Sequence, residues 1–178
     1  MKLLVAYASK YGSTAEIANI IGKELRKRNY EVEVKPAEAV DSLDGYDGFV
    51  IGSGLYAGGW IKSAADFLRA NQDRLAAHPV WLFSSGPTGE GDPNAILDGW
   101  TFPDDLESVR EAIQPRDVIL FHGNIDPNKL NFAERMIIKS VKATVGDFRD
   151  WLVIRGWARS IDLGLQADKF RVNDLRRK

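Results

Sequence analysis

Short apolar runs recur along the chain and alternate with segments of helical periodicity. The runs are rich in β-branched residues, and compact runs of this kind are typical of strands buried on both faces. Because helical segments lie between them, the order predicts a parallel sheet covered by helices. The expected strands are Lys2–Ala8, Glu31–Lys35, Gly48–Ser53, Val80–Ser84 and Asp117–His122.

The first helix has the clearest pattern, with a stripe of apolar residues at i, i+3 and i+4 from Ser13 to about Arg28, and Asn29 ends it. Five strands joined in this way predict an α/β, three-layer, doubly wound parallel sheet of order 2-1-3-4-5. We expect one domain over 1–178, with an extra helix after the fifth strand. The remaining helical segments are expected at Ala39–Leu43, Ile61–Leu75, Pro103–Gln114, Asn131–Val145 and Asp150–Ala167.

Composition excludes several functions. The 24 basic and 25 acidic residues nearly cancel, which leaves no electrostatic footprint for nucleic acid. The absence of cysteine from the sequence excludes disulfides, thiolate zinc sites and cysteine nucleophiles. His78 and His122 fit no metal-ligand spacing, so we expect no metal site. No run approaches the ~20 apolar residues of a membrane span, so we expect a soluble, cytoplasmic protein.

The segment between the first strand and the first helix holds three hydroxyls and a glycine in six residues. Backbone N–H groups at a helix start, with the positive end of the helix dipole, attract an anion. Three hydroxyls exceed what one helix cap needs, although an ordinary cap stays an alternative. We predict a phosphate site formed by Ser9, Lys10, Tyr11, Gly12, Ser13 and Thr14.

Two further loops should meet this segment, because ligands of doubly wound sheets bind at the carboxyl ends of the strands where strand order reverses. Small residues in both loops let the backbone approach a ligand closely. Tyr56 is expected to stack on a flat ring, and Trp60 to pack in the core. The predicted binding residues of these loops are Gly54, Leu55, Tyr56, Ala57, Gly58, Ser84, Ser85, Gly86, Pro87, Thr88 and Gly89.

The ligand class follows by elimination. Gly52-x-Gly54 lies after the wrong strand for a dinucleotide fingerprint, and the sequence lacks a nucleoside-triphosphate loop. The first loop also lacks acids for Mg²⁺, which indicates a phosphate monoester that stays bound and is not cleaved. Flavin mononucleotide (FMN), with one phosphate and one planar ring, matches.

The motif Ser9-x-Tyr11-Gly12-x-Thr14 resembles the phosphate loop of the flavodoxin family. Within that family the chain is similar to the menaquinone-dependent protoporphyrinogen IX dehydrogenase branch in three segments, which are 49–58, 132–139 and Asp150-Trp151. The resemblance implies a flavodoxin-like fold, bound FMN, a porphyrinogen as small-molecule electron donor and a quinone acceptor. Residues 85–92 are rich in glycine and proline where that branch would be more basic, so the substrate stays open.

Other functions remain open. They are a flavodoxin-type electron carrier, an NAD(P)H-linked quinone reductase, a flavin-free interaction module, and a hydrolase using Ser53 or Ser84 with His122. The missing Gly-x-Ser-x-Gly motif argues against the hydrolase. No side chain is assigned a catalytic role, because the flavin would carry the redox chemistry.

The predicted helix over 131–145 has an apolar face and a basic face. Such a helix either touches an anionic membrane peripherally or covers the domain with its basic face in solvent. The apolar face holds Leu130, Ile137, Val141 and Val145, and the basic face holds Arg135, Lys139 and Lys142.

Overall fold

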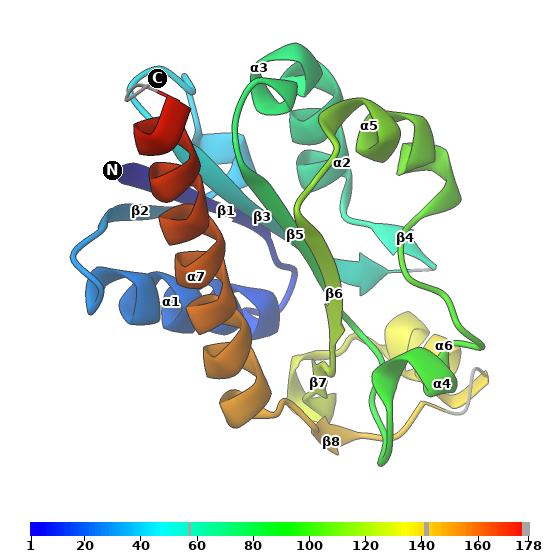
Figure 1. Cartoon of the computed structure of the whole chain (residues 1–178). Helices are drawn as coiled ribbons and strands as arrows, with labels where there is room; N and C mark the ends of the chain where they lie inside the picture. The colour runs from blue at the N-terminus through cyan, green and yellow to red at the C-terminus, as the bar shows by residue number, and fades with distance from the viewer. Residues whose placement is uncertain (57, 141–142, 176–178) are drawn as a thin grey trace.

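The computed structural model describes the backbone of residues 1–56, 58–140 and 143–175, with side chains as far as residue 167. Five parallel strands form the central sheet in the order β2-β1-β3-β5-β6, which confirms the predicted topology (Figure 1). A short strand, β4 (Gly59–Trp60), pairs antiparallel with β3. The parallel strands are β1 (Lys2–Ala8), β2 (Glu31–Pro36), β3 (Gly48–Tyr56), β5 (Val80–Ser85) and β6 (Asp117–Phe121).

Both faces of the sheet are buried. Figure 1 shows α1 (Ser13–Arg26) and α7 (Trp151–Leu175) on one face, and α2 (Lys62–Ala70), α3 (Gln72–Ala76) and α5 (Glu107–Ile113) on the other. Side chains alternate along a strand, so Leu3 and Val5 pack with the first pair of helices while Leu4 and Ala6 pack with the second group. Burial on both faces explains why the strands are apolar throughout.

Three predicted helices differ from the structure. The segment expected over Ile61–Leu75 forms two helices, α2 and α3. Asn71 lies between them, and its side-chain amide donates to the Phe67 carbonyl at 2.8 Å. The helix expected from Pro103 starts as a 3₁₀ turn, η2 (Asp104–Leu106), before α5. The helix expected over Ala39–Leu43 was wrong, because a 3₁₀ turn, η1 (Ala37–Ala39), ends at its first residue and residues 40–43 are not helical.

The chain after β6 holds more structure than the sequence predicts. The extra helix is confirmed as α6 (Phe132–Ser140), but residues 143–145 are not helical and 141–142 lie outside the described residues. β8 (Gly146–Asp147) pairs with β7 (Asn124–Ile125), a contact between distant segments that local periodicity does not encode. Two single turns complete this end of the molecule, η3 (Pro127–Lys129) and α4 (Pro93–Ile96).

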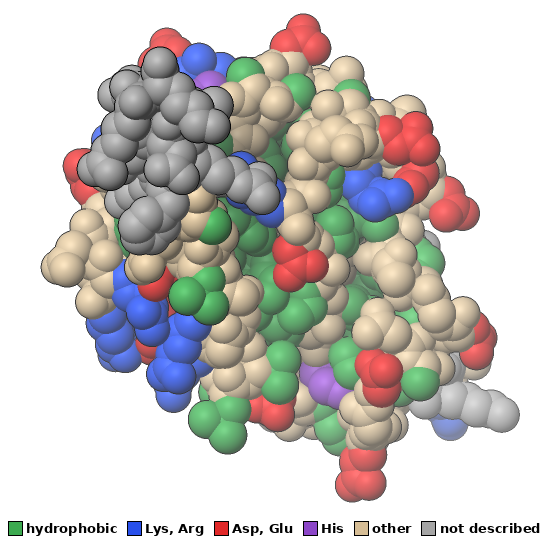
Figure 2. All heavy atoms as spheres, in the orientation of Figure 1, with side chains coloured by type: hydrophobic (Ala, Val, Ile, Leu, Met, Phe, Trp, Pro, Cys, Tyr) green, Lys and Arg blue, Asp and Glu red, His purple; other side chains and the backbone are tan. Residues whose placement is uncertain are grey.

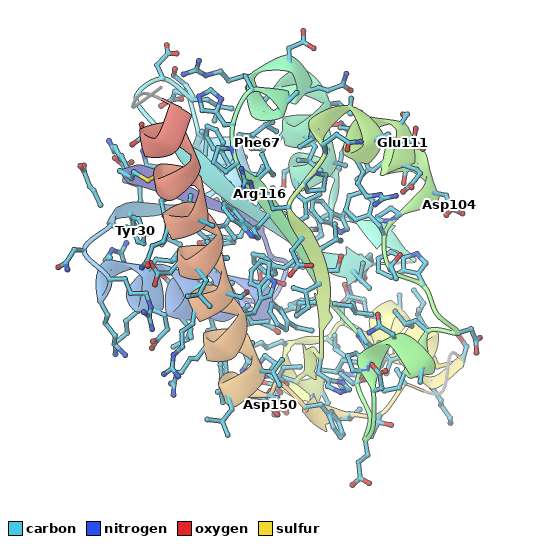
Figure 3. The ribbon with its side chains drawn as sticks, viewed as in Figure 1. Tyr30, Phe67, Asp104, Glu111, Arg116 and Asp150 are labelled. Carbon is cyan, nitrogen blue, oxygen red and sulfur yellow. The ribbon has the colours of Figure 1, made fainter. Side chains whose placement is uncertain are left out.

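Asp150 starts α7, because its carboxylate accepts hydrogen bonds from the N–H groups of Leu152 at 2.8 Å and Val153 at 3.1 Å. Figure 3 labels this residue at the lower end of the helix, where α7 begins its path across the sheet. Within the described part of the chain, none of the helices combines the length and apolarity needed to cross a bilayer.

Candidate functional site

The carboxyl ends of the central strands lie side by side, and the predicted loops begin there. Ala8 of β1 is in register with Ser53 of β3, and Ser53 with Ser84 of β5. Glycines let the loops approach one another, since a Cβ at Gly54 would lie 3.0 Å from the Thr14 hydroxyl. A Cβ at Gly86 would lie 2.6 Å from the side chain of Leu55, so these two loops are also in contact.

The segment from Ser9 to Thr14 forms a tight turn into α1. Gly12 occupies the N-cap position with φ 90° and ψ −13°, and its N–H donates to the Ser9 hydroxyl at 3.1 Å. Among the described residues no side chain caps α1, so an ordinary hydroxyl cap does not account for this segment. The first-turn N–H groups and the positive helix end are therefore suited to bind an anion.

The second loop is more regular than expected, because β3 continues to Tyr56 and turns back into β4. The phenol of Tyr56 is 42% exposed, whereas Trp60 is buried, as predicted. The Trp60 indole packs edge-on against Phe102 and donates to the Ser84 hydroxyl at 2.8 Å. Gly58 has a positive φ of 83° in the hairpin turn, and Ala57 lies outside the described residues.

The third loop leaves β5 at Ser85 and is held against the chain after β6. Gly123 donates to the Pro87 carbonyl at 2.9 Å, and a Cβ at Gly123 would lie 2.7 Å from the Gly86 carbonyl oxygen. Gly89 adopts φ 145° beyond it. Thr88 is buried, and its hydroxyl has no hydrogen-bond partner among the described residues. Leaving such a group unpaired costs free energy, so a polar ligand atom at this place would be stabilising.

Lys10 and Tyr56 meet a residue that the sequence did not predict, Glu134 of α6. The Lys10 ammonium donates to the Glu134 carboxylate at 2.5 Å and to the Tyr56 hydroxyl at 2.8 Å, and Tyr56 donates to Glu134 at 3.1 Å. The ammonium also lies 4.0 Å from the centre of the Tyr56 ring. These contacts tie the extra helix to two of the three loops.

Charge pairing stabilises the ionised forms of this cluster. The hydrogen bond to Glu134, followed by that to Tyr56, raises the pKa of Lys10 well above its usual value. The hydrogen bonds from Lys10 and then Tyr11 lower the pKa of Glu134 to about 2. Asn131 and Glu134 exchange backbone-to-side-chain hydrogen bonds of 2.9 Å in a capping box. That Asn-x-x-Glu spacing was the sequence signal that could have singled out Glu134.

The structure argues against the serine hydrolase. The hydroxyls of Ser53 and Ser84 are fully buried, and they bond to the Ile61 N–H and Trp60 indole respectively. The ring nitrogens of His122 face the carbonyl oxygens of Pro87 and Gly91 instead of either serine. No cluster of three potential metal ligands occurs among the residues that the structure describes.

Comparisons with known proteins agree with this arrangement. Protoporphyrinogen IX dehydrogenase [quinone] of Escherichia coli (strain K12) is 26% identical over 86 residues, 47% of this chain and 48% of that protein. The chain thus matches about half the length of its curated relatives. Oxidised flavodoxin 2 from Bacillus cereus is 26% identical, with a TM-score of 0.51, covering 69% of this chain and 85% of that one.

A flavodoxin from the domain Archaea, 19% identical, has the same fold with a TM-score of 0.51 over 80% of this chain and 99% of its own. The profile of the flavodoxin domain matches residues 4–150. A match over most of the chain, together with the sheet order and the converging loops, supports a flavin-dependent redox role and shows that the chain belongs to the flavodoxin family.

Proposed function

We propose that the chain binds FMN, with the phosphate on Ser9–Thr14 and the ring beside the loops 54–58 and 84–89. The observation that carries this proposal is the convergence of the three loops at one sheet edge, with α1 uncapped among the described residues and the Thr88 hydroxyl unpaired there. The flavin, when bound, supplies the redox chemistry, and the protein binds and orients it.

The chain's own residues have distinct parts in this proposal. The N–H groups at the start of α1 bind the phosphate oxygens, and the Ser9 hydroxyl holds the turn through the Gly12 N–H. Tyr56 offers an exposed ring face for stacking, and the Lys10–Glu134 ion pair fixes its hydroxyl. Thr88 would hydrogen-bond a polar edge of the flavin.

For the reaction, we propose the oxidation of a porphyrinogen with a quinone as the final acceptor. The curated relative supports this proposal, and so does the extra helix, which joins the flavin loops through Glu134. Oxidation of one porphyrinogen to a porphyrin releases six electrons and six protons, which three quinones take up, two electrons and two protons each, to become three quinols. The structural similarity to small flavodoxins favours a second candidate, a protein that only carries electrons between partners.

We also propose that α6 touches an anionic membrane surface, where quinones reside. Within Phe132–Ser140, all of them described, Glu134 is the one buried side chain, so α6 does not pack on the domain as an apolar cover. Phe132 is 81% exposed, and Met136 and Ile137 are more than half exposed. Arg135 and Lys139 are also exposed, which gives the helix the apolar and basic character of interfacial helices.

The test starts from flavin binding. We expect FMN fluorescence to be quenched on titration with the purified protein, and anaerobic protoporphyrinogen IX to bleach the bound flavin, which a menaquinone analogue then reoxidises. Absence of FMN binding would refute the flavoprotein proposal. Binding without bleaching, but with rapid electron exchange with a partner such as a ferredoxin reductase, would support the electron carrier instead.

A further inference from the structure

Arg149 is a buried cation outside the three predicted loops. It lies between β8 and α7, and its side chain is 4% exposed. Its guanidinium donates two hydrogen bonds to the Asp147 carboxylate, at 2.8 and 2.6 Å, and lies 4.5 Å from the centre of the Trp151 ring. The remaining guanidinium nitrogen points toward α1, which is distant from Arg149 in sequence.

That nitrogen contacts the first turn of α1, the turn that follows the phosphate loop. It donates to the Ser13 carbonyl oxygen at 3.1 Å and to the Glu16 carboxylate at 2.8 Å. Glu16 is the acidic residue of the first turn of α1, and its side chain is 58% exposed. A carboxylate at a helix N-terminus favours the helix, but it also competes with any other anion for the same positive end.

We propose that Arg149 is a positioning and specificity residue that makes the start of α1 available to a phosphate, by neutralising Glu16 and holding Ser13. Arg149 thereby sets the preference of the site for FMN over riboflavin, which has the same ring and lacks the phosphate. This inference rests on the proposed function, because it concerns the phosphate of the same ligand.

The charges of this cluster predict a rank order of FMN affinity among variants. Taken together, the Arg149 guanidinium and the carboxylates of Glu16 and Asp147 carry a net charge of −1. Arg149→Gln changes this local charge to −2, Glu16→Gln changes it to 0, and the double variant returns it to −1. FMN affinity should therefore rank Glu16→Gln above wild type, wild type equal to the double variant, and Arg149→Gln last.

The experiment measures dissociation constants for FMN and riboflavin by flavin fluorescence in these four proteins, at low and at high salt. We expect Arg149→Gln to weaken FMN binding roughly three- to tenfold, the size of a charge effect at a helix end. Riboflavin binding should change little in all four proteins. High salt should shrink the differences, because it screens the Glu16 charge. Arg149→Lys, which keeps the charge, should retain most of the preference for FMN.

A role for Arg149 in packing alone predicts a different result, in which Arg149→Gln weakens FMN and riboflavin equally and Glu16→Gln does not restore the double variant. Either finding would overturn the proposal. If the arginine variants do not fold, the Glu16→Gln variant decides alone. The Glu16 carboxylate is largely exposed, so this variant should fold, and its affinity for FMN must rise relative to its affinity for riboflavin. A wild-type protein that does not bind FMN would instead refute the proposed function itself.

Discussion

Gly12 determines the backbone conformation of the proposed phosphate loop, Ser9–Thr14. Its φ of 90° is a conformation that side chains disfavour, although a Cβ there would meet no atom within 4 Å. Gly12→Ala should therefore strain the loop by about 1–2 kcal/mol without a clash. If the phosphate binds at this turn, the strain distorts it, and we expect FMN affinity to fall roughly tenfold or more. Isothermal titration calorimetry measures this change.

Gly45 provides a matched control for that substitution. It also has a positive φ, 79°, and open space around a built Cβ, but it lies in the turn before β3, at the opposite end of the sheet. Gly45→Ala should cost similar stability and leave FMN affinity unchanged. Equal FMN affinities in the two alanine variants would place the phosphate elsewhere.

A single hydroxyl group, that of Tyr30, forms a buried hydrogen bond to α7. Its O–H donates to Asp162 at 2.9 Å, and this carboxylate is 2% exposed (Tyr30 is labelled in Figure 3). Burial, followed by the bond to Asp162, raises the pKa of Tyr30 to about 12. Tyr30→Phe should lower the free energy of unfolding by about 1.5–3 kcal/mol, because one of the donors to a buried charge is lost while Arg28 and Gln166 still donate to Asp162.

Urea denaturation measures this loss, and Tyr46→Phe is its counterpart at a wetter site. Tyr46 donates to Glu33, which is a third exposed and also pairs with Lys2 and Lys35. The second substitution should therefore cost less, and neither should change FMN affinity. A larger loss for Tyr46→Phe than for Tyr30→Phe would contradict the argument from burial.

At the scale of elements, α6 is held by an ion pair more than by apolar packing. Glu134 is its buried side chain, and the Lys10 hydrogen bond is the first cause that lowers the Glu134 pKa to about 2. A carboxyl of depressed pKa stabilises the folded state above its ordinary value, about 4.3, and this stabilisation is lost as pH falls toward 2. We therefore expect α6 to stay docked above about pH 5 and to detach between about pH 4 and 2.

Nuclear magnetic resonance can follow this detachment through the Glu134 carboxyl carbon and the backbone amides of α6. The Glu134→Gln variant is the control, because its α6 amides should not respond to acid over the same range. Titration of wild-type Glu134 near its ordinary value would show that the ion pair with Lys10 does not form in solution.

The elements also show what the sequence could and could not predict. The strands and the loops at their carboxyl ends follow from hydrophobic periodicity and turn residues, which depend on near neighbours in sequence. The strand order follows from the rules for connections in a parallel sheet. Glu134, Arg149 and the β7–β8 pair reach the site or close this end of the molecule through contacts with residues more than 20 positions away in sequence. The Asn-x-x-Glu spacing marks Glu134 as a helix-capping residue, but local spacing carries no information on its contact with Lys10 or on that of Arg149 with α1.

At the scale of the whole molecule, the net charge of −1 conceals a separation of charges. Figure 2 shows Lys and Arg side chains gathered over α1 and α7, and acidic side chains along the edge near α5. Around the buried carboxylate of Glu24 lie three cations, Lys27, Arg155 and Arg159. Because the cations are gathered on parts of the surface, an anionic membrane should bind where exposed apolar side chains lie next to exposed cations.

The exposed apolar residues of α6 and α7 allow the membrane proposal to be tested on one molecule. Phe132 and Met136 of α6 are 81% and 54% exposed, and Leu152 and Leu163 of α7 are 80% and 66% exposed. If α6 is the contact, wild type should float with vesicles of anionic lipid, and Phe132→Ser with Met136→Ser should abolish flotation. Leu152→Ser with Leu163→Ser removes similar apolar exposure and should leave flotation intact.

Salt and lipid charge then separate the two contributions to this binding. Neutral vesicles or high salt should weaken flotation of the wild type, because Arg135 and Lys139 no longer attract the surface, while the apolar side chains retain some affinity. Loss of flotation in the α7 variant with retention in the α6 variant would move the contact to α7 and its neighbouring basic cluster. A wild type that remains in solution with anionic vesicles would refute the proposed contact of α6 with a membrane.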